Sequence, residues 1–153
     1  MNLRIGIVLG STREGRASED VGKWVLENAK TTEGVSFEIV DIKDFDLPFL
    51  GTTEDMSNVG KWNAKLNELD GFVFVVAEYN HSMTAALKNA LDSARDAWNN
   101  KSAGIVSYGS AGGARAAEHL RGVLSELQVA SVRTHVLLSL FDDFENYKFK
   151  PRD

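Results

Sequence analysis

Residues 71–77 read GFVFVVA and are apolar at successive positions, and the polar stretch EYNHS follows directly at 78–82. A strand that meets solvent on one face alternates apolar and polar residues, whereas a strand covered on both faces is apolar throughout. We therefore expect residues 71–77 to form a central strand of a parallel sheet that carries helices on both faces.

Further strand candidates lie on both sides of this segment, separated by stretches of helical periodicity. They are LRIGIVLG (3–10), SFEIVDI (36–42), SAGIVSYG (102–109) and SVRTHVLLSL (131–140). Four helices are expected among them, and one carries Leu87, Leu91, Ala94 and Trp98 on its inner face. This alternation predicts an α/β fold with an open five-stranded parallel sheet, and the 153 residues suit one domain spanning 1–153.

The C-terminal segment FDDFENYKFKPRD (141–153) is too short and too polar for a full fifth helix. We expect the last helix of such a fold to be missing, so that one flank of the sheet lacks a cover. An uncovered flank favours association between copies of the chain, and we therefore expect a homodimer or homotetramer.

Composition and charge exclude several classes of protein. The formal net charge is −5 and the sequence pI is about 5.2, which argues against nucleic acid or an anionic membrane as a partner. The chain has no cysteine, so disulfides, a thiolate nucleophile and thiolate metal ligands are ruled out. The N-terminal apolar run is broken by Arg4 and is too short for a signal or membrane segment. We expect a cytoplasmic protein without a metal site.

Three loops of unusual composition follow strand candidates, at residues 10–18, 77–84 and 107–113. In an open parallel sheet, ligands bind beyond the carboxyl ends of the strands, where the strand order reverses. The three loops converge only if the first, third and fourth strands are neighbours. The flavodoxin-like order 2-1-3-4-5 makes them neighbours, and we expect that order.

The first loop, GSTREGRAS (10–18), has the composition of an anion site. Hydroxyl groups, guanidinium groups and the free amides of a helix N-terminus together suit a phosphate. The side chains concerned are Ser11, Thr12, Arg13, Arg16 and Ser18. An ordinary helix cap at Ser18 with two solvated arginines would explain the same composition. Glu19 and Asp20 in the first helical turn would also repel a phosphate if they faced it.

Two better-known phosphate loops do not match this segment. Gly10 and Gly15 have the spacing of a P-loop, but Arg16 and Ala17 stand where lysine and serine or threonine are required. The dinucleotide fingerprint G-x-G-x-x-G is absent after the first strand, and Asp41 at the end of the second strand is only a weak signal for it. A triphosphate hydrolase is therefore disfavoured.

The second loop places Glu78, Tyr79, Asn80 and His81 at the end of the central strand, where aromatic and amide groups can frame a planar heteroaromatic ring. A tyrosine that merely covers the strand end is the simpler interpretation of Tyr79. His81 has no cysteine or neighbouring histidine to complete a metal site. His119 and His135 are expected to be structural or solvent-facing.

The third loop, in SYGSAGGARAAEHLR (107–121), again puts glycine and serine at a turn from strand to helix. Gly109, Gly112 and Gly113 allow the backbone to approach a ligand, so that amides can bind the polar edge of a ring. The spacing G-x-S-x-G of a hydrolase nucleophile does not occur here.

Together, these loops resemble the NADPH-dependent FMN reductase family, a flavodoxin-like group that includes quinone, azo-dye and chromate reductases. The segments that carry the resemblance are GSTREGR (10–16), DIKDFDLPFL (41–50), EYNHSMTAALKNALD (78–92) and VSYGSAGGARAAEHLR (106–121). Each is weak alone, but four in the same order are strong evidence. The resemblance extends from near the start of the chain to the fifth strand.

The resemblance implies a non-covalently bound FMN and a reaction with NADPH or NADH. Ser11, Thr12, Arg13 and Arg16 would hold its phosphate, while Glu78, Tyr79, Asn80 and His81 would line the isoalloxazine. Ser107, Tyr108, Gly109 and Gly112 would close over the pyrimidine side. The flavin N5 would carry the chemistry, so no catalytic side chain is expected, and the last partner would be a small-molecule electron acceptor.

The chain departs from the family at two places. Ala77 stands where members commonly have proline before EYN, and the C-terminal helix with which members usually continue is not recognisable. Two other functions remain open at this point. One is a flavodoxin-like single-electron carrier, although such carriers have an arginine-free phosphate loop. The other is a flavin-free module that binds a partner.

Overall fold

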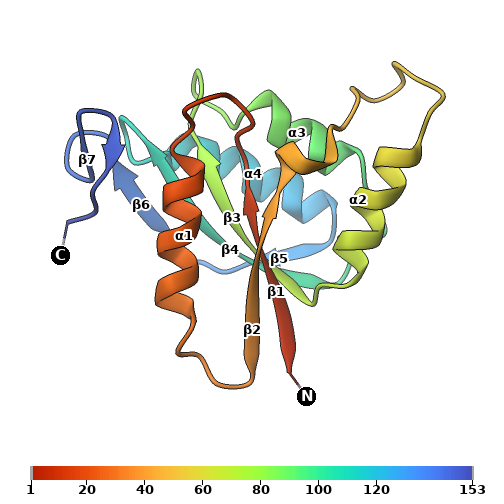
Figure 1. Cartoon of the computed structure of the whole chain (residues 1–153), viewed down its shortest axis with the longest axis horizontal. Helices are drawn as coiled ribbons and strands as arrows, with labels where there is room; N and C mark the ends of the chain where they lie inside the picture. Colours follow the sequence, from red (N-terminus) through yellow and green to blue (C-terminus); the bar gives the residue numbers. More distant parts are fainter. Residues whose placement is uncertain (1, 153) are drawn as a thin grey trace.

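The computed structural model describes residues 2–152 and confirms the expected sheet order (Figure 1). Five parallel strands run β2-β1-β3-β4-β5, and β6 also pairs with β4. The strands are β1 (Leu3–Leu9), β2 (Val35–Asp41), β3 (Gly71–Ala77), β4 (Lys101–Gly109), β5 (Val129–Ser131) and β6 (Val136–Ser139). The helices are α1 (Ser18–Ala29), α2 (Ser57–Asn67), α3 (Ala85–Asp92) and α4 (Ala114–Glu126), with a 3-10 turn, η1, at Ile42–Phe45.

The strand register brings the carboxyl ends of β1, β3 and β4 to one edge of the sheet. Leu9 of β1 is paired with Val75 of β3, and Ala77 at the end of β3 is paired with Tyr108 of β4. The loops that follow these strands therefore meet at the upper edge in Figure 1. This is the crevice where the strand order reverses, since α1 leaves β1 toward one face and α3 leaves β3 toward the other.

Helices cover both faces of β3, as its continuous apolar sequence predicts. On one face, Trp62 and Trp98 are fully buried with Phe72 and Phe74 beneath α2, α3 and α4. The Trp98 ring lies 4.9 Å from the ring of Phe72, centroid to centroid. Both indole N–H groups donate to backbone carbonyls, so these large side chains are buried without an unpaired donor. The other face packs against α1.

No helix within residues 2–152 is long and apolar enough to cross a bilayer.

The third helix is shorter than its periodicity predicts. α3 ends at Asp92, so Ala94 and Trp98 lie beyond it, although both are buried as expected. Side chains take up carbonyls of the final helical turn. Ser93 Oγ donates to Asn89 O at 2.7 Å, and Trp98 Nε1 donates to Leu91 O at 3.2 Å. Asn89 O still accepts Ser93 N at 2.9 Å, whereas Leu91 O is the carbonyl that a continued helix would offer to Arg95 N, so the Trp98 bond competes with continuation of the backbone ladder.

The predicted fifth strand, 131–140, is in fact divided into β5 and β6. β5 lies mostly before the predicted range, and both strands pair with β4. Residues 132–135 between them are not in a strand, although Val132 N still donates to Ala103 O of β4 at 2.9 Å. Arg121 of α4 explains the interruption, because its guanidinium donates to the carbonyls of Val132 at 2.8 Å and Arg133 at 3.0 Å. A helix side chain has replaced a strand as the partner of these carbonyls.

The C-terminal segment forms a β-hairpin instead of a helix, so within residues 2–152 the expected absence of a fifth helix is confirmed, but the flank that we expected to be bare is partly covered. β7 (Phe144–Glu145) pairs with β8 (Lys148–Phe149) beside β6, at the left of Figure 1. Asn146 and Tyr147 have φ values of 49° and 63° at the turn, which is the conformation of a tight hairpin. The Phe149 ring lies 5.8 Å from that of Trp24 in α1, so the hairpin covers part of the α1 face.

Candidate functional site

The three predicted loops are joined to one another at the carboxyl edge of the sheet. Thr84 at the start of α3 donates its hydroxyl to the carbonyl of Gly10, which links the second loop to the first. Glu78 N donates to Tyr108 O at 2.9 Å, which links the second loop to the third. The predicted site residues therefore share one edge of the fold, although their side chains differ in direction.

The first loop presents a run of backbone donors. Among residues 2–152, no protein acceptor receives the N–H groups of residues 11–15. Ala17 is the cap residue of α1 and supplies no side-chain bond, so the helix N-terminus is also open. Ser18 is the first residue of the helix rather than its cap, and it is fully buried with Oγ 3.5 Å from Ser11 O. Unpaired N–H groups with the positive end of a helix dipole attract an anion.

The sequence led us to expect that Arg16 binds a phosphate, but the structure turns its guanidinium inward. Its guanidinium is ion-paired with Asp41 at 2.5 Å and with Glu19 at 2.7 Å, and it also donates to Ser11 O at 2.8 Å. Burial lowers the pKa of Arg16, but the two carboxylates more than offset this and raise it above its usual value. Arg13 is exposed and has no hydrogen bond or ion pair within the described chain. Arg13 is thus the guanidinium of this loop that is free to meet an anion.

Glu78 also departs from the expected orientation. Its buried carboxylate is ion-paired with Arg115 and accepts the backbone N–H of Arg115 at 3.1 Å and of Ala116 at 3.4 Å. Burial raises the pKa of Glu78, but these bonds outweigh burial and hold the pKa below its usual value. Glu78 therefore caps α4 and fixes the second loop to the third, instead of facing a ring.

Residues 79–82 form a tight turn at the tip of the second loop. Tyr79 and Ser82 exchange backbone hydrogen bonds of 2.7 and 3.1 Å. Asn80 and His81 occupy the two left-handed positions between them, with φ values of 46° and 71°. Asparagine and histidine are among the residues that tolerate this conformation. The Tyr79 side chain is 58% exposed, so the turn offers an aromatic face to a ligand.

His119 of α4 supports this turn, which sequence patterns did not indicate. Its Nδ1 lies 2.9 Å from the hydroxyl of Ser82, and its ring centroid lies 6.0 Å from that of His81. His119 and Ser82 are 37 positions apart in the chain, so only the packing of α4 against the end of β3 brings them together.

The third loop offers backbone rather than side chains. Ser107 is fully buried and donates its hydroxyl to Gly112 O at 2.8 Å. Tyr108 points into the α1 layer, 6.0 Å from the ring of Phe144, and burial raises its pKa to about 12. Gly112 and Gly113 have φ values of 67° and 74°. A Cβ atom on Gly113 would lie 2.7 Å from Ser107 Cβ, so glycine is required for this close approach.

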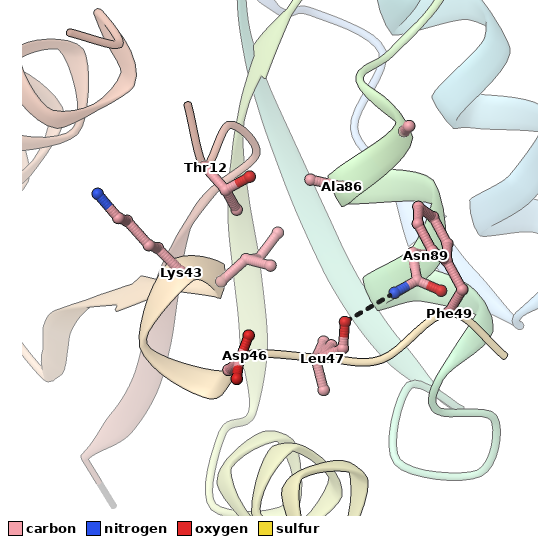
Figure 2. Close-up of a pocket in the computed structure, with 9 residues that line it drawn as sticks. Thr12, Lys43, Asp46, Leu47, Phe49, Ala86 and Asn89 are labelled. Atoms are coloured by element: carbon pink, nitrogen blue, oxygen red, sulfur yellow. Dashed lines mark hydrogen bonds between the residues drawn. The ribbon is translucent and has the colours of Figure 1, made fainter. Parts of the chain in front are cut away.

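A cavity of about 380 Å³ opens beside the first loop, between η1, the segment after it and α3 (Figure 2). Thr12 is the one predicted site residue in its wall. The other residues that line the cavity are Ile42, Lys43, Asp46, Leu47, Phe49, Ala85, Ala86 and Asn89. The Asn89 amide holds the segment in place by donating to Pro48 O at 3.0 Å, and Lys43 is turned aside to Glu14. The segments DIKDFDLPFL and AALKN supply these residues, but neither contains a chemical signal for a cavity.

A family model agrees with this fold and arrangement of loops. Residues 3–143 match the model for NADPH-dependent FMN reductase, so the match includes all three loops, η1 and the sheet.

Individual relatives agree with the family model. An NAD(P)H-dependent FMN reductase from Schizosaccharomyces pombe is 34% identical over 146 residues, which cover 90% of this chain and 73% of that protein. A 2-hydroxy-1,4-benzoquinone reductase from Burkholderia sp. is 33% identical over 137 residues, covering 84% of this chain and 74% of that protein. The solved structure of FerB, a flavoenzyme NAD(P)H:(acceptor) oxidoreductase from Paracoccus denitrificans, shares the fold. Its TM-score is 0.76 at 19% identity, with 97% of this chain and 86% of that chain covered.

Proposed function

Since this chain belongs to the NADPH-dependent FMN reductase family and is therefore an FMN-dependent NAD(P)H oxidoreductase, we propose how its loops hold the cofactor. Residues 1–153 act as one FMN-binding domain. The FMN phosphate binds at the first loop, and the isoalloxazine lies over the ends of β3 and β4.

The run of unpaired N–H groups at residues 11–15, together with the uncapped start of α1, is the observation that carries this proposal. A phosphate dianion needs several donors, and this loop supplies backbone N–H groups, the hydroxyls of Ser11 and Thr12 and the free guanidinium of Arg13. Arg16 and Ser18 are buried behind the loop and support its shape. The donor set fits a phosphate monoester and needs no metal ion.

The second and third loops suit a flat, polar ring. Tyr79, Asn80 and His81 form a rigid exposed turn, whose conformation is fixed by two backbone hydrogen bonds. Gly109 and Gly112 lie in the third loop and pack closely, since a Cβ on Gly109 would meet Glu78 Cβ at 2.9 Å and one on Gly112 would meet Leu137 Cβ at 3.0 Å. Their backbone groups bind the pyrimidine edge in this proposal. Glu78, Ser107 and Tyr108 act indirectly, because their side chains are bonded or packed inside the fold.

When bound, FMN takes up hydride from NAD(P)H and passes the electrons to an acceptor, so the chain need not supply a nucleophile or a base. The protein's part is to orient the ring and restrict access to it. The acceptor is a small molecule, and the 2-hydroxy-1,4-benzoquinone reductase among the relatives supports a quinone. This assignment disfavours a carrier that exchanges single electrons with proteins.

We also propose a homodimer or homotetramer in the cytoplasm, with NADPH or NADH as the reductant. Apolar side chains along β6 and the turn after it support association. Val136 and Leu140 are both 41% exposed, and Phe141 is 79% exposed. Light scattering coupled to size-exclusion chromatography measures the mass, and a monomer across a range of concentrations would contradict the assembly.

Titration with FMN and with riboflavin tests the proposed cofactor site. Quenching of flavin fluorescence reports binding of either molecule, and they differ only in the phosphate. We expect FMN to bind more tightly by at least about 100-fold, because several charge-assisted bonds are lost with the phosphate. Equal affinities would remove the phosphate from the first loop, and no binding of FMN at micromolar concentrations would overturn the cofactor assignment.

A further inference from the structure

We propose that Asp41 is a positioning residue for the cofactor phosphate, acting through Arg16 on the backbone of the first loop. The inference rests on the proposed function, since it concerns the same phosphate. It differs from the expectation that Arg16 binds the phosphate directly, and it gives a role to a carboxylate that would otherwise oppose an anion.

All the donors of Arg16 are already used within the protein. A guanidinium has five N–H groups. Nε donates to Glu19 at 2.9 Å, Nη1 donates to Ser11 O at 2.8 Å and to Asp41 at 3.1 Å, and Nη2 donates to Glu19 at 2.7 Å and to Asp41 at 2.5 Å. The Arg16 side chain is only 4% exposed. No donor remains for a phosphate unless one of these bonds is broken.

Asp41 is held where it can orient this guanidinium. It is the last residue of β2 and is paired with Leu9 of β1, the residue just before the first loop. Its Oδ1 also accepts Lys43 N at 3.0 Å and so caps η1. Its side chain is 15% exposed. The carboxylate is therefore fixed by the sheet and by η1, and it accepts hydrogen bonds from two nitrogens of Arg16.

The bond from Arg16 to Ser11 O determines where the loop presents its donors. In a trans peptide, the carbonyl and the following N–H point in opposite directions. Because Ser11 O faces Arg16, the N–H of Thr12 faces away from it, toward the open side of the loop. The carbonyl of Gly10 is held in the same manner by the Thr84 hydroxyl, which directs the N–H of Ser11. Two successive amides are thus oriented by side chains behind them.

Considered by charge alone, the Asp41 carboxylate should weaken the binding of a nearby phosphate. Arg16 contributes one positive charge, and Asp41 and Glu19 contribute two negative charges, so the cluster is negative beside the expected phosphate. Removal of the Asp41 charge would strengthen FMN binding if only the electrostatic field mattered. Removal would weaken FMN binding if Asp41 positions the loop. The sign of the change separates these two explanations.

The experiment measures the affinities of Asp41→Asn for FMN and for riboflavin. Asparagine retains an oxygen that can cap η1 at Lys43 N, but its NH₂ group cannot accept from Arg16. We expect FMN affinity to fall by about tenfold or more, with riboflavin affinity changed less than threefold, because only the phosphate contacts are disturbed. Asp20→Asn is the matched control. Asp20 is exposed in the first turn of α1, has no hydrogen bond or ion pair among residues 2–152, and carries the same charge.

Arg16→Lys keeps the charge and provides a second test if Asp41→Asn does not fold. Lysine has three donors on a single atom and cannot bind both carboxylates and Ser11 O in this geometry. The inference predicts the same selective loss of FMN affinity in this variant. Unchanged or tighter FMN binding by either folded variant would overturn the inference while leaving the cofactor assignment intact. If the wild-type protein did not prefer FMN to riboflavin, the proposed phosphate site itself would fail.

Discussion

Glu78, just after β3, is ion-paired with Arg115 in the first turn of α4, and its carboxylate also accepts two backbone N–H groups of that turn. This contact ties the second loop to the third, and so it fixes the spacing of the two loops over which the flavin ring is proposed to lie. It is one of several places where a side chain that was expected to line a cofactor is bonded within the fold.

Glu78→Gln should lower the free energy of unfolding at neutral pH by about 1–2 kcal/mol. This loss is smaller than for a fully buried ion pair, because solvent screens the partly exposed Arg115. The native pKa of Glu78 lies below its usual value, so the carboxylate stabilises the fold above its unfolded pKa. That stabilisation is lost as the pH falls through the native pKa. Urea unfolding should therefore show a difference between wild type and variant that is largest near neutral pH and shrinks in acid. Glu118→Gln, which changes an exposed side chain of α4, is the control. A difference independent of pH would contradict this explanation.

Arg13→Ala should weaken FMN binding by about 10- to 100-fold and leave riboflavin binding unchanged, because Arg13 is the exposed guanidinium of the first loop without a protein partner. Fluorescence titration at two salt concentrations should also show that the variant's affinity depends less on ionic strength. Arg133→Ala removes an exposed arginine outside the three loops and serves as the control. Parallel losses of FMN and riboflavin affinity would show that Arg13 does not act on the phosphate.

Gly113→Ala should destabilise the third loop by about 1–3 kcal/mol and reduce FMN binding, since its φ is 74° and a Cβ would meet Tyr108 N at 2.7 Å. Gly15→Ala is an informative comparison. Its φ is 64°, but nothing lies within 4 Å of an added Cβ, so only the conformational cost of about 1 kcal/mol applies. Thermal unfolding measures both effects. Equal destabilisation by the two substitutions would show that the contact with Tyr108 is not limiting.

Ala86→Trp should fill the cavity in Figure 2 with little effect on FMN affinity, because Thr12 is the one proposed phosphate contact in its wall and the proposed ring position lies over the ends of β3 and β4. Circular dichroism verifies the fold, and titration with FMN gives the result. A large loss of FMN affinity in a folded variant would place the cofactor in the cavity beside Phe49 and Asn89 instead.

The strand order could be predicted because local sequence and topology agree. The continuous apolar run 71–77 required a strand covered on both faces, and three polar loops had to share an edge, which the order 2-1-3-4-5 provides. The division of the fifth strand could not be predicted in this way. It depends on Arg121, a residue of the preceding helix that binds two strand carbonyls.

The meeting of the three loops at one edge followed from the sequence, but the directions of their side chains did not. Arg16 lies in a loop with the composition of a phosphate site, yet its partner Asp41 is 25 residues away and reaches it only through the pairing of β1 with β2. Glu78 and Arg115 are 37 residues apart and meet only when α4 starts against the end of β3. Long-range ion pairs of this kind leave no periodic pattern in the chain.

The most direct test of the central claim is a visible absorption spectrum of the FMN-loaded protein before and after anaerobic addition of NADPH. The proposed function predicts that the flavin band disappears on reduction and returns when an oxidised quinone is added. A band that persists in the presence of excess NADPH, in protein shown by titration to hold FMN, would contradict the assignment of this chain as an FMN-dependent NAD(P)H oxidoreductase.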